Sequence, residues 1–443
     1  MDKRTDLSQL TTEALETELA QRRSRERVAE DSYAVEVGLE AEAHQYVARQ
    51  LDAYYAAREA TQTTASQPCP RCGQLCRVRR PRVQRTIQSL HGVHVLRRHY
   101  HYCPRCRTGW FPLDLALGLP DAGDVTARLE QVVLDLGLHG PFAEAAERCA
   151  LHHGVALSEN LVRRVIDRVG RCAQAQTDLG ARLRPAAAEV PATLVVQVDG
   201  SMLPTRGPDP WREVKVGLVT RSDHIVANKQ RGLITEARFV ARLGDLDGFK
   251  TALTDALHLE RAWECPRVVV VGDGAPWVWG LADDLCPGAI QILDYPHALE
   301  HAVTAAQVLF RPESGLDRVF VATIERQLHA GRVDEVVREL EACAFTARGR
   351  DRQALIDLAR YYRTHATRMR YDRYRARGLP CGSGAIESAH RHVVQKRMKL
   401  AGQHWDPLRA DRFVGLRAAL ATCGPRRLHA AIRSDLRRTG SYD

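Results

Sequence analysis

Three acidic residues stand at the end of apolar runs or among small residues. Asp199 ends Leu194-Val-Val-Gln-Val-Asp199, Asp273 follows Val268-Val-Val-Val-Gly272, and Glu387 ends Cys381-Gly-Ser-Gly-Ala-Ile-Glu387. The first two runs are short, rich in valine and stopped by glycine, which predicts buried strands. A carboxylate at such a position is costly unless a cation meets it. Carboxylates converging on Mg²⁺, or Mn²⁺ in its place, are what two-metal phosphoryl transfer requires, so this triad predicts a polynucleotidyl transferase.

Two cysteine pairs predict a second metal site. Cys69-Pro-Arg-Cys72 and Cys103-Pro-Arg-Cys106 are near-copies, and four thiolates at this spacing are typical of structural Zn²⁺. The segment between the pairs can form a hairpin, which would give a zinc ribbon. A redox-active Cys-x2-Cys would not account for the duplication. Three other residues could substitute as ligands: Cys76, His99 and His101.

Composition favours a polyanionic partner. The 443 residues carry a net charge of +10 and a pI of about 9.1, and phosphate contacts supply most non-specific affinity for nucleic acid. We therefore expect double-stranded DNA as the partner. The polar start of the chain and the lack of an apolar run of ~18 residues predict a cytoplasmic, nucleoid-associated protein with no membrane partner.

The order of predicted elements indicates a multidomain α/β protein. Strands are expected at 193–198, 213–220, near 224–228, at 268–271 and at 290–293, with helices between and after them. This alternation predicts a sheet covered on both faces. With the triad spread over 189 residues, it fits a ribonuclease-H-like catalytic core with a helical insertion.

The predicted domains follow the shifts in pattern along the chain. They are an N-terminal helical region (1–62), a zinc-ribbon module (63–112), a helical region with a possible helix-turn-helix (113–188), the first part of the core (189–312), the helical insertion (313–378), a core-closing helix with Glu387 (379–420) and a basic tail (421–443).

A helix-turn-helix is one interpretation of residues 141–169. A short helix ends at Gly154, and Ser158 is a candidate N-cap for a second, basic helix that carries Arg163 and Arg164. In such a motif the second helix enters the major groove. Ordinary packing of two helices across a glycine turn is the alternative.

Further residues could support the triad or contact DNA. Asp294 and His297 follow the last predicted strand, where Asp294 could assist the site or simply cap the next helix. Arg397 and Lys399 form a basic segment, and Trp405 could stack on a splayed base or close a helical core.

These motifs together resemble those of bacterial insertion-sequence transposases of the DDE type, and most of all the ISKra family. The resemblance rests on the Cys-Pro-x-Cys pairs, Val198-Asp-Gly200 with Trp211-Arg-Glu-Val-Lys-Val-Gly217, Val271-Gly-Asp-Gly-Ala-Pro-Trp277, Leu293-Asp-Tyr-Pro-His-Ala-Leu-Glu-His301, Gly382-Ser-Gly-Ala-Ile-Glu-Ser388 and Lys396-Arg-Met-Lys-Leu-Ala-Gly-Gln-His-Trp405. It covers nearly the whole chain.

The resemblance implies binding to terminal inverted repeats, cleavage and strand transfer, with Asp199, Asp273 and Glu387 as catalytic residues and Asp294 and His297 in support. A transposase must hold two ends, so a homodimer or larger assembly on DNA is expected, with the helix of residues 12–60 as a candidate contact. Two alternatives remain: a ribonuclease-H-like nuclease without strand transfer, and a zinc-ribbon DNA-binding regulator.

Overall fold

The computed structural model describes residues 16, 17, 19–21, 31–119, 124–176, 179–227 and 232–436. The chain divides into two compact units. The first comprises Met1–Val132, Ala146–Leu157 and Thr439–Asp443, and the second comprises Val133–Ala145 and Ser158–Arg438. No helix in the described part of the chain is both long enough and apolar enough to span a membrane.

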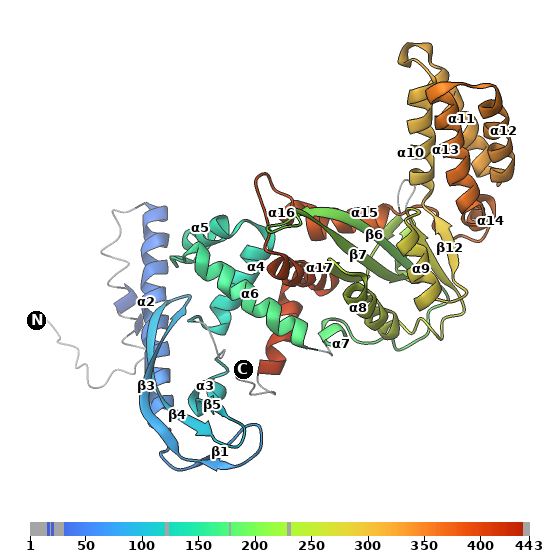
Figure 1. Ribbon diagram of the computed structural model, residues 1–443. Helices are drawn as coiled ribbons and strands as arrows, with labels where there is room; N and C mark the ends of the chain where they lie inside the picture. The colour runs from blue at the N-terminus through green and yellow to red at the C-terminus, as the bar shows by residue number, and fades with distance from the viewer. Residues whose placement is uncertain are drawn as a thin grey trace, which may run out of the picture. The chain divides into compact units, whose positions relative to one another are not determined.

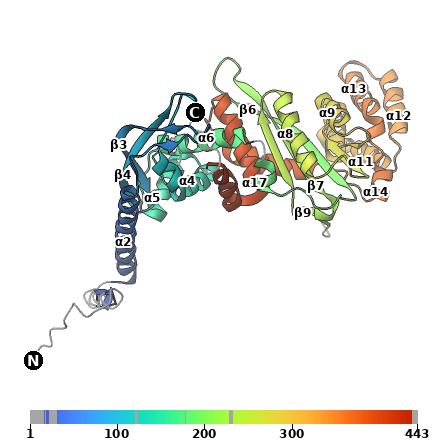
Figure 2. The ribbon, with the colours of Figure 1, turned by 90° about the horizontal axis from the view of Figure 1, so that it is seen from below.

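The first unit is built on a long hairpin (Figures 1 and 2, blue). Its antiparallel strands are β3 (Val78–Ser89) and β4 (Gly92–Cys103), and β5 (Thr108–Trp110) pairs with β4. The helix α2 (Ser32–Ala60) begins at Asp31, whose carboxylate accepts a hydrogen bond from the backbone N–H of Ala34. Tyr55 of α2 is buried with Ile87 and Leu96 of the hairpin, so the C-terminal part of α2 belongs to the core of this unit.

Shorter elements complete the first unit and lead into the second. The two-residue strands β1 (Gln67–Pro68) and β2 (Leu75–Cys76) pair with each other, and α3 (Pro112–Leu117) follows β5. Helices α4 (Ala127–His139) and α5 (Phe142–His153) each contribute residues to both units.

The second unit contains a five-stranded mixed sheet in the order β10-β7-β6-β11-β12. Its strands are β6 (Leu194–Pro204), β7 (Trp211–Arg221), β10 (Arg238–Leu243), β11 (Val268–Gly272) and β12 (Ile290–Leu293). β7 runs antiparallel to both β6 and β10, whereas β6, β11 and β12 are parallel. The valine-rich runs of β6 and β11 are buried, as expected for central parallel strands.

Helices cover this sheet. They are α8 (Leu246–Leu259), α9 (Pro276–Leu285), α6 (Glu159–Ala175), α7 (Leu179–Leu183) and the long α17 (Pro407–Leu436), which packs on β10 and α6. α17 is kinked at Gly424, where φ is +76°.

A helical region follows β12 (Figure 1, orange). It consists of α10 (Tyr295–Leu309), α11 (Leu316–His329), α12 (Val333–Thr346), α13 (Gly349–His365) and α14 (Tyr371–Ala376), in agreement with the helices predicted for this stretch. The chain then returns to the sheet through α15 (Gly384–Ala389), a π-helical turn (His390–Gln395) and α16 (Lys396–Met398).

The structure corrects the place of one predicted strand. The third strand of the sheet is β10, whereas residues 225–227 form β8 (Ile225–Ala227), which pairs with β9 (Gly232–Ile234) in a separate ribbon. The predicted tail at 421–443 begins three residues before Gly424, where the backbone of α17 leaves the helical conformation. The predicted N-terminal helix of residues 12–60 includes α2, its described residues 16, 17 and 19–21 are helical, and the rest of 12–30 lies outside the described part of the chain.

Candidate active site and metal centre

Asp199 and Asp273 lie level with each other on neighbouring parallel strands. In the register of β6 and β11, Val271 stands opposite Gln197, so both aspartates come two residues beyond the last pair. Strands in a sheet are about 4.8 Å apart, so the two carboxylates share one edge. Burial raises the pKa of Asp199, and the nearby charge of Asp273 adds to this rise, while His390 opposes it.

Backbone groups orient both aspartates. The N–H of Gly200 donates to Oδ1 of Asp199 (2.6 Å), and the N–H of Ala275 donates to Oδ1 of Asp273 (3.0 Å). Each carboxylate therefore keeps one oxygen that is not used by these backbone bonds. Two such oxygens at a sheet edge are suitable ligands for a hard cation.

Glu387 lies on α15, which Gln197 ties to β6. The side-chain oxygen of Gln197 accepts from the N–H of Ile386 (3.0 Å), and its Nε2 donates to the carbonyl of Gly382 (3.3 Å). Glu387 itself is exposed, and its carboxylate forms no ion pair with any residue in the described ranges. Gln197 thus holds the segment that precedes Glu387 against β6, the strand that carries Asp199.

A buried histidine and a lysine flank Asp199. Nε2 of His390 lies 3.4 Å from Oδ2 of Asp199, and its Nδ1 lies 3.1 Å from the hydroxyl of Ser201. Burial lowers the pKa of His390, which fits a neutral ring that accepts from Ser201 and points its Nε2–H at the carboxylate. Burial likewise lowers the pKa of Lys399, and Asp199 partly offsets that effect, which places Lys399 within electrostatic reach of the site.

Asp294 is the N-cap of α10 and a bridge to the segment before Glu387. Oδ2 accepts from the N–H of His297 (3.1 Å), and Oδ1 accepts from the N–H of Ser383 (2.7 Å). At 2% exposure both of its oxygens are used within the protein, so Asp294 acts as a positioning residue. The charge of His297 lowers the pKa of Asp199, so this histidine lies close enough to influence the site.

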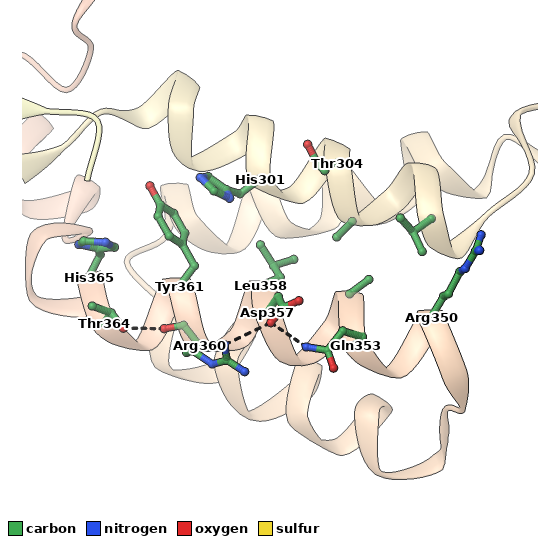
Figure 3. Close-up of a pocket in the computed structure, with 13 residues that line it drawn as sticks. His301, Thr304, Arg350, Gln353, Asp357, Leu358, Arg360, Tyr361, Thr364 and His365 are labelled. Atoms are coloured by element: carbon green, nitrogen blue, oxygen red, sulfur yellow. Dashed lines mark hydrogen bonds and ion pairs between the residues drawn. The ribbon is translucent and has the colours of Figure 1, made fainter. Parts of the chain in front are cut away.

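The helical region is fastened to the turn that carries Asp273. The hydroxyl of Tyr361 on α13 donates to the Asp273 carbonyl (3.0 Å), and its ring stacks on His301 with centroids 3.8 Å apart. Figure 3 shows these two rings at one end of a groove between α10 and α13, with His365 beyond Tyr361. The groove has a volume of about 660 Å³.

The cysteine pairs form a metal-binding geometry. Within the described ranges, one group of three or more His, Cys, Asp or Glu side chains has its ligand atoms all within 4.8 Å of one another, and it is Cys69, Cys72, Cys103 and Cys106. This cluster could hold Zn²⁺. The N–H of Cys106 lowers the pKa of Cys103 to about 6, and thiolates are the form that binds the metal.

The other two sets of candidate ligands do not meet this criterion. Cys76 donates to the Gln74 carbonyl (3.4 Å), Nδ1 of His99 accepts from the N–H of Arg82 (3.2 Å), and His101 lies beside the Cys76 carbonyl (3.1 Å). The carboxylate oxygens of Asp199, Asp273 and Glu387 do not lie within 4.8 Å of one another as a trio.

One of the predicted DNA contacts is enclosed in the interior. Arg397 is 1% exposed, and its guanidinium lies 4.8–5.4 Å from the ring centroids of Phe142, Phe413 and Trp405. Its prediction as a direct surface contact is wrong. Trp405 is half-buried, donates from Nε1 to the Met398 carbonyl (3.0 Å) and packs on Phe413, so its stacking on a base stays a prediction.

The predicted recognition helix exists, but the motif around it stays a prediction. Ser158 caps α6 by accepting from the N–H of Leu161 (3.1 Å). Arg164 is exposed, whereas Arg163 is half-buried and donates to Asn160 (2.9 Å). The turn before α6 lies where the chain passes from one unit to the other.

Sequence reasoning missed Gln197, Ser201 and His390. Gln197 carried a signal, since it interrupts an apolar strand and a buried amide must find partners. His390 follows Glu387 by three residues and therefore lies on the same helix face. No local pattern around Ser201 marks it as a partner of that histidine.

Comparisons with known proteins do not assign the chain to a family. No family model matches the sequence, and no curated protein matches it. Among solved structures, one match is a Drosophila P element transposase strand transfer complex, with 12% sequence identity, 71% of this chain and 83% of that chain covered, and a TM-score of 0.23. A TM-score this low does not establish a shared fold.

Proposed function

We propose that the chain is a DDE transposase of an insertion sequence, similar to the ISKra family, with Asp199, Asp273 and Glu387 as its catalytic residues. The observation that carries the proposal is the strand register, which places Asp199 and Asp273 level on neighbouring parallel strands. The hydrogen bonds of Gln197 to the segment that carries Glu387 support it.

The strand order supports a ribonuclease-H-like core. In sequence order the sheet reads third, second, first, fourth and fifth strand, with the second strand antiparallel to the first. This is the arrangement of a ribonuclease-H-like sheet. The helical region α10–α14 lies between the fifth strand and Glu387, as expected for an insertion before the last catalytic residue.

The donor set fits a hard divalent cation. The site offers carboxylate oxygens, and the charge of Asp273 already raises the pKa of Asp199, so a cation between them would relieve their repulsion. Bound there, Mg²⁺ or Mn²⁺ would neutralise charge on the scissile phosphate and lower the pKa of an attacking water or 3′-hydroxyl. His390 and Gly200 hold Asp199 in place, and Lys399 supplies positive charge beside the phosphate.

The proposed reaction has two steps, a hydrolysis and a transesterification. Water cleaves the phosphodiester at the element's end and leaves a 3′-hydroxyl, and this hydroxyl then attacks a phosphodiester of target DNA. Each step forms one P–O bond and breaks another, so no oxidant or nucleoside triphosphate is needed. The net charge of +10 suits the double-stranded DNA on which the protein would act.

The test uses full-length protein, Mg²⁺ and a duplex that carries the DNA flanking this gene. We expect strand cleavage and joining to a target plasmid, both lost in Asp199→Asn, Asp273→Asn and Glu387→Gln while gel-shift affinity stays within a few-fold. Asp284→Asn is the matched control, since Asp284 pairs with Lys250 on the exposed surface (2.6 Å).

The outcomes separate the candidate functions. Cleavage without joining would support a nuclease with the same core. DNA binding without any cleavage, unchanged by the three substitutions, would support a zinc-ribbon regulator. Cleavage that survives in any one of the variants would remove that residue from the site.

A further inference from the structure

A cavity lined by arginines lies in the same unit as the candidate active site. This cavity, of about 330 Å³, opens between the start of α6, the start of α17 and the segment that joins α16 to α17. Five arginines line it: Arg163, Arg206, Arg397, Arg409 and Arg412. Its carboxylates are Glu159, Asp167 and Asp406, so the lining is positive.

Most of this charge is not neutralised within the protein. Arg412 pairs with Asp167 (2.8 Å), and Asp406 accepts from the N–H of Arg409 (3.0 Å). The guanidinium groups of the other four arginines form no ion pair with any described residue. Five arginines against three carboxylates leave the lining with a net charge of +2, which attracts an anion.

Arg397 is the buried member of this group. Its guanidinium lies among the rings of Phe142, Trp405 and Phe413. Burial together with the charge of Arg417 lowers its pKa to about 10, and the charge of Glu144 partly opposes this. It therefore remains a cation at neutral pH. Arg417 is held by its hydrogen bonds to the carbonyls of Leu138, His392 and Val393. Two neighbouring buried cations are costly, and an anion at the cavity mouth offsets part of that cost.

The cavity is linked to the active site by the backbone. β6 carries Asp199 and continues to Pro204, and the N–H of Arg206 donates to the Trp405 carbonyl (2.8 Å). The chain from Asp199 to Arg206 spans at most roughly 25 Å, so the cavity and the candidate active site are close enough to contact one duplex.

We infer that this cavity binds a backbone phosphate of the DNA whose end is cut at Asp199. Arginine forks hold phosphate through paired N–H bonds, and the half-buried Arg163 and exposed Arg206 are placed to form them at the mouth. Arg397 supplies positive charge from the buried part of the lining. This inference rests on the proposed function, because it assigns the anion to the substrate of that site.

Salt dependence of binding tests the phosphate contact. Affinity for a 40-base-pair duplex of arbitrary sequence is measured between 50 and 300 mM salt for the wild type, Arg163→Gln, Arg206→Gln and Arg352→Gln. Loss of one phosphate contact lowers the slope of log K against log salt by about 0.9. We expect that change in the first two variants and none in Arg352→Gln, a surface arginine on α13. Equal slopes in all four proteins would overturn the inference.

Two further measurements identify the anion and separate the two proposals. A methylphosphonate scanned along a cleavable duplex should weaken wild-type binding at one position away from the cut and should have no further effect there in Arg206→Gln. If inorganic phosphate raises the melting temperature only when Arg163 and Arg206 are present while the DNA slopes stay equal, the occupant is a free phosphate and the inference fails. Altered slopes in a protein that cleaves no DNA would keep the phosphate site and reject the transposase.

Discussion

Gln197 and Ile386 are 189 residues apart in the chain and are joined by a hydrogen bond of 3.0 Å from the Ile386 N–H to the Gln197 side chain. Gln197 lies two residues before Asp199, and Ile386 directly precedes Glu387. One side chain therefore couples the position of the first catalytic candidate to that of the third. The Gln197 amide also donates to Gly382 (3.3 Å), which holds the start of α15 at two points.

Replacing Gln197 should damage catalysis more than binding. Gln197→Leu leaves the Gly382 carbonyl without its partner, at a cost of about 1–3 kcal/mol when buried, while the Ile386 N–H keeps its bond to the Ser383 carbonyl (2.8 Å). We expect α15 to shift and kcat for cleavage to fall at least ~10-fold, with KM for DNA little changed. Gln291→Leu is the matched control. Gln291 lies on β12 of the same sheet, and its side chain forms hydrogen bonds with Asp283 and Arg368 and not with the segment that carries Glu387. Equal losses in both variants would mean that Gln197 acts only through stability.

His390 should position Asp199. His390→Ala removes the 3.4 Å contact with the carboxylate, so we expect slower cleavage and a higher Mg²⁺ concentration for half-maximal rate. His390→Gln can still donate to Asp199 and should recover part of the rate. Ser201→Ala should have a smaller effect in the same direction, since it only orients the ring. An unchanged Mg²⁺ requirement in His390→Ala would contradict this role.

Zinc should depend on four cysteines and not on the fifth nearby. Cys72→Ser should reduce the zinc content of reduced protein from about one equivalent per chain and unfold the hairpin module, because metal binding in so small a module is folding energy. Cys76→Ser should keep its zinc, since Cys76 lies outside the ligand group. Metal analysis and hydrogen exchange over residues 67–110 measure both effects. Loss of zinc in Cys76→Ser would reassign the ligands.

Acid should destabilise the helical region through His365. Burial lowers the pKa of His365 to about 4, against about 6.5 in an unfolded chain. Between these values the unfolded state binds more protons, so stability is fully present above about pH 6.5 and is lost as the pH falls toward 4. The loss is on the order of 3 kcal/mol.

Thermal unfolding between pH 4 and 7.5 measures this effect. His365→Phe keeps a ring against Tyr361 and Trp279 and should flatten the pH dependence. His404→Gln, a change at an exposed histidine, should leave it as in the wild type. A wild-type dependence that persists in His365→Phe would assign the acid sensitivity to another group.

Local sequence patterns predicted the elements that depend on residues close to them in the sequence. The valine runs of β6 and β11, the N-cap at Ser158 and the duplicated cysteine knuckles carry their signals within a few residues, and the structure contains all of them. β10 was missed because it begins with an arginine. This arginine, Arg238, can be buried because Glu260 and three backbone carbonyls accept its hydrogen bonds. These partners are remote in sequence.

The same reason explains the error at Arg397. A basic segment next to a tryptophan resembles a nucleic-acid contact, and its sequence does not show that Phe142 and Phe413 enclose the guanidinium. Likewise, Lys399 was predicted as a DNA contact from its charge alone. The structure adds that it lies near Asp199, which only tertiary packing determines.

Assembly on DNA should depend on the outer face of α2. Tyr55 and Leu51 at its C-terminal end pack into the hairpin core, whereas Tyr33 and Val37, one helical turn apart near its start, are 75% and 48% exposed. Apolar residues left exposed on a helix can bury against a second copy. We expect Tyr33→Lys with Val37→Lys to reduce the mass of the DNA-bound complex from at least a dimer to a monomer, as measured by light scattering. Leu151→Lys, at 78% exposure, should leave the mass unchanged. A double variant that still pairs two ends would show that the dimer contact lies elsewhere in the chain.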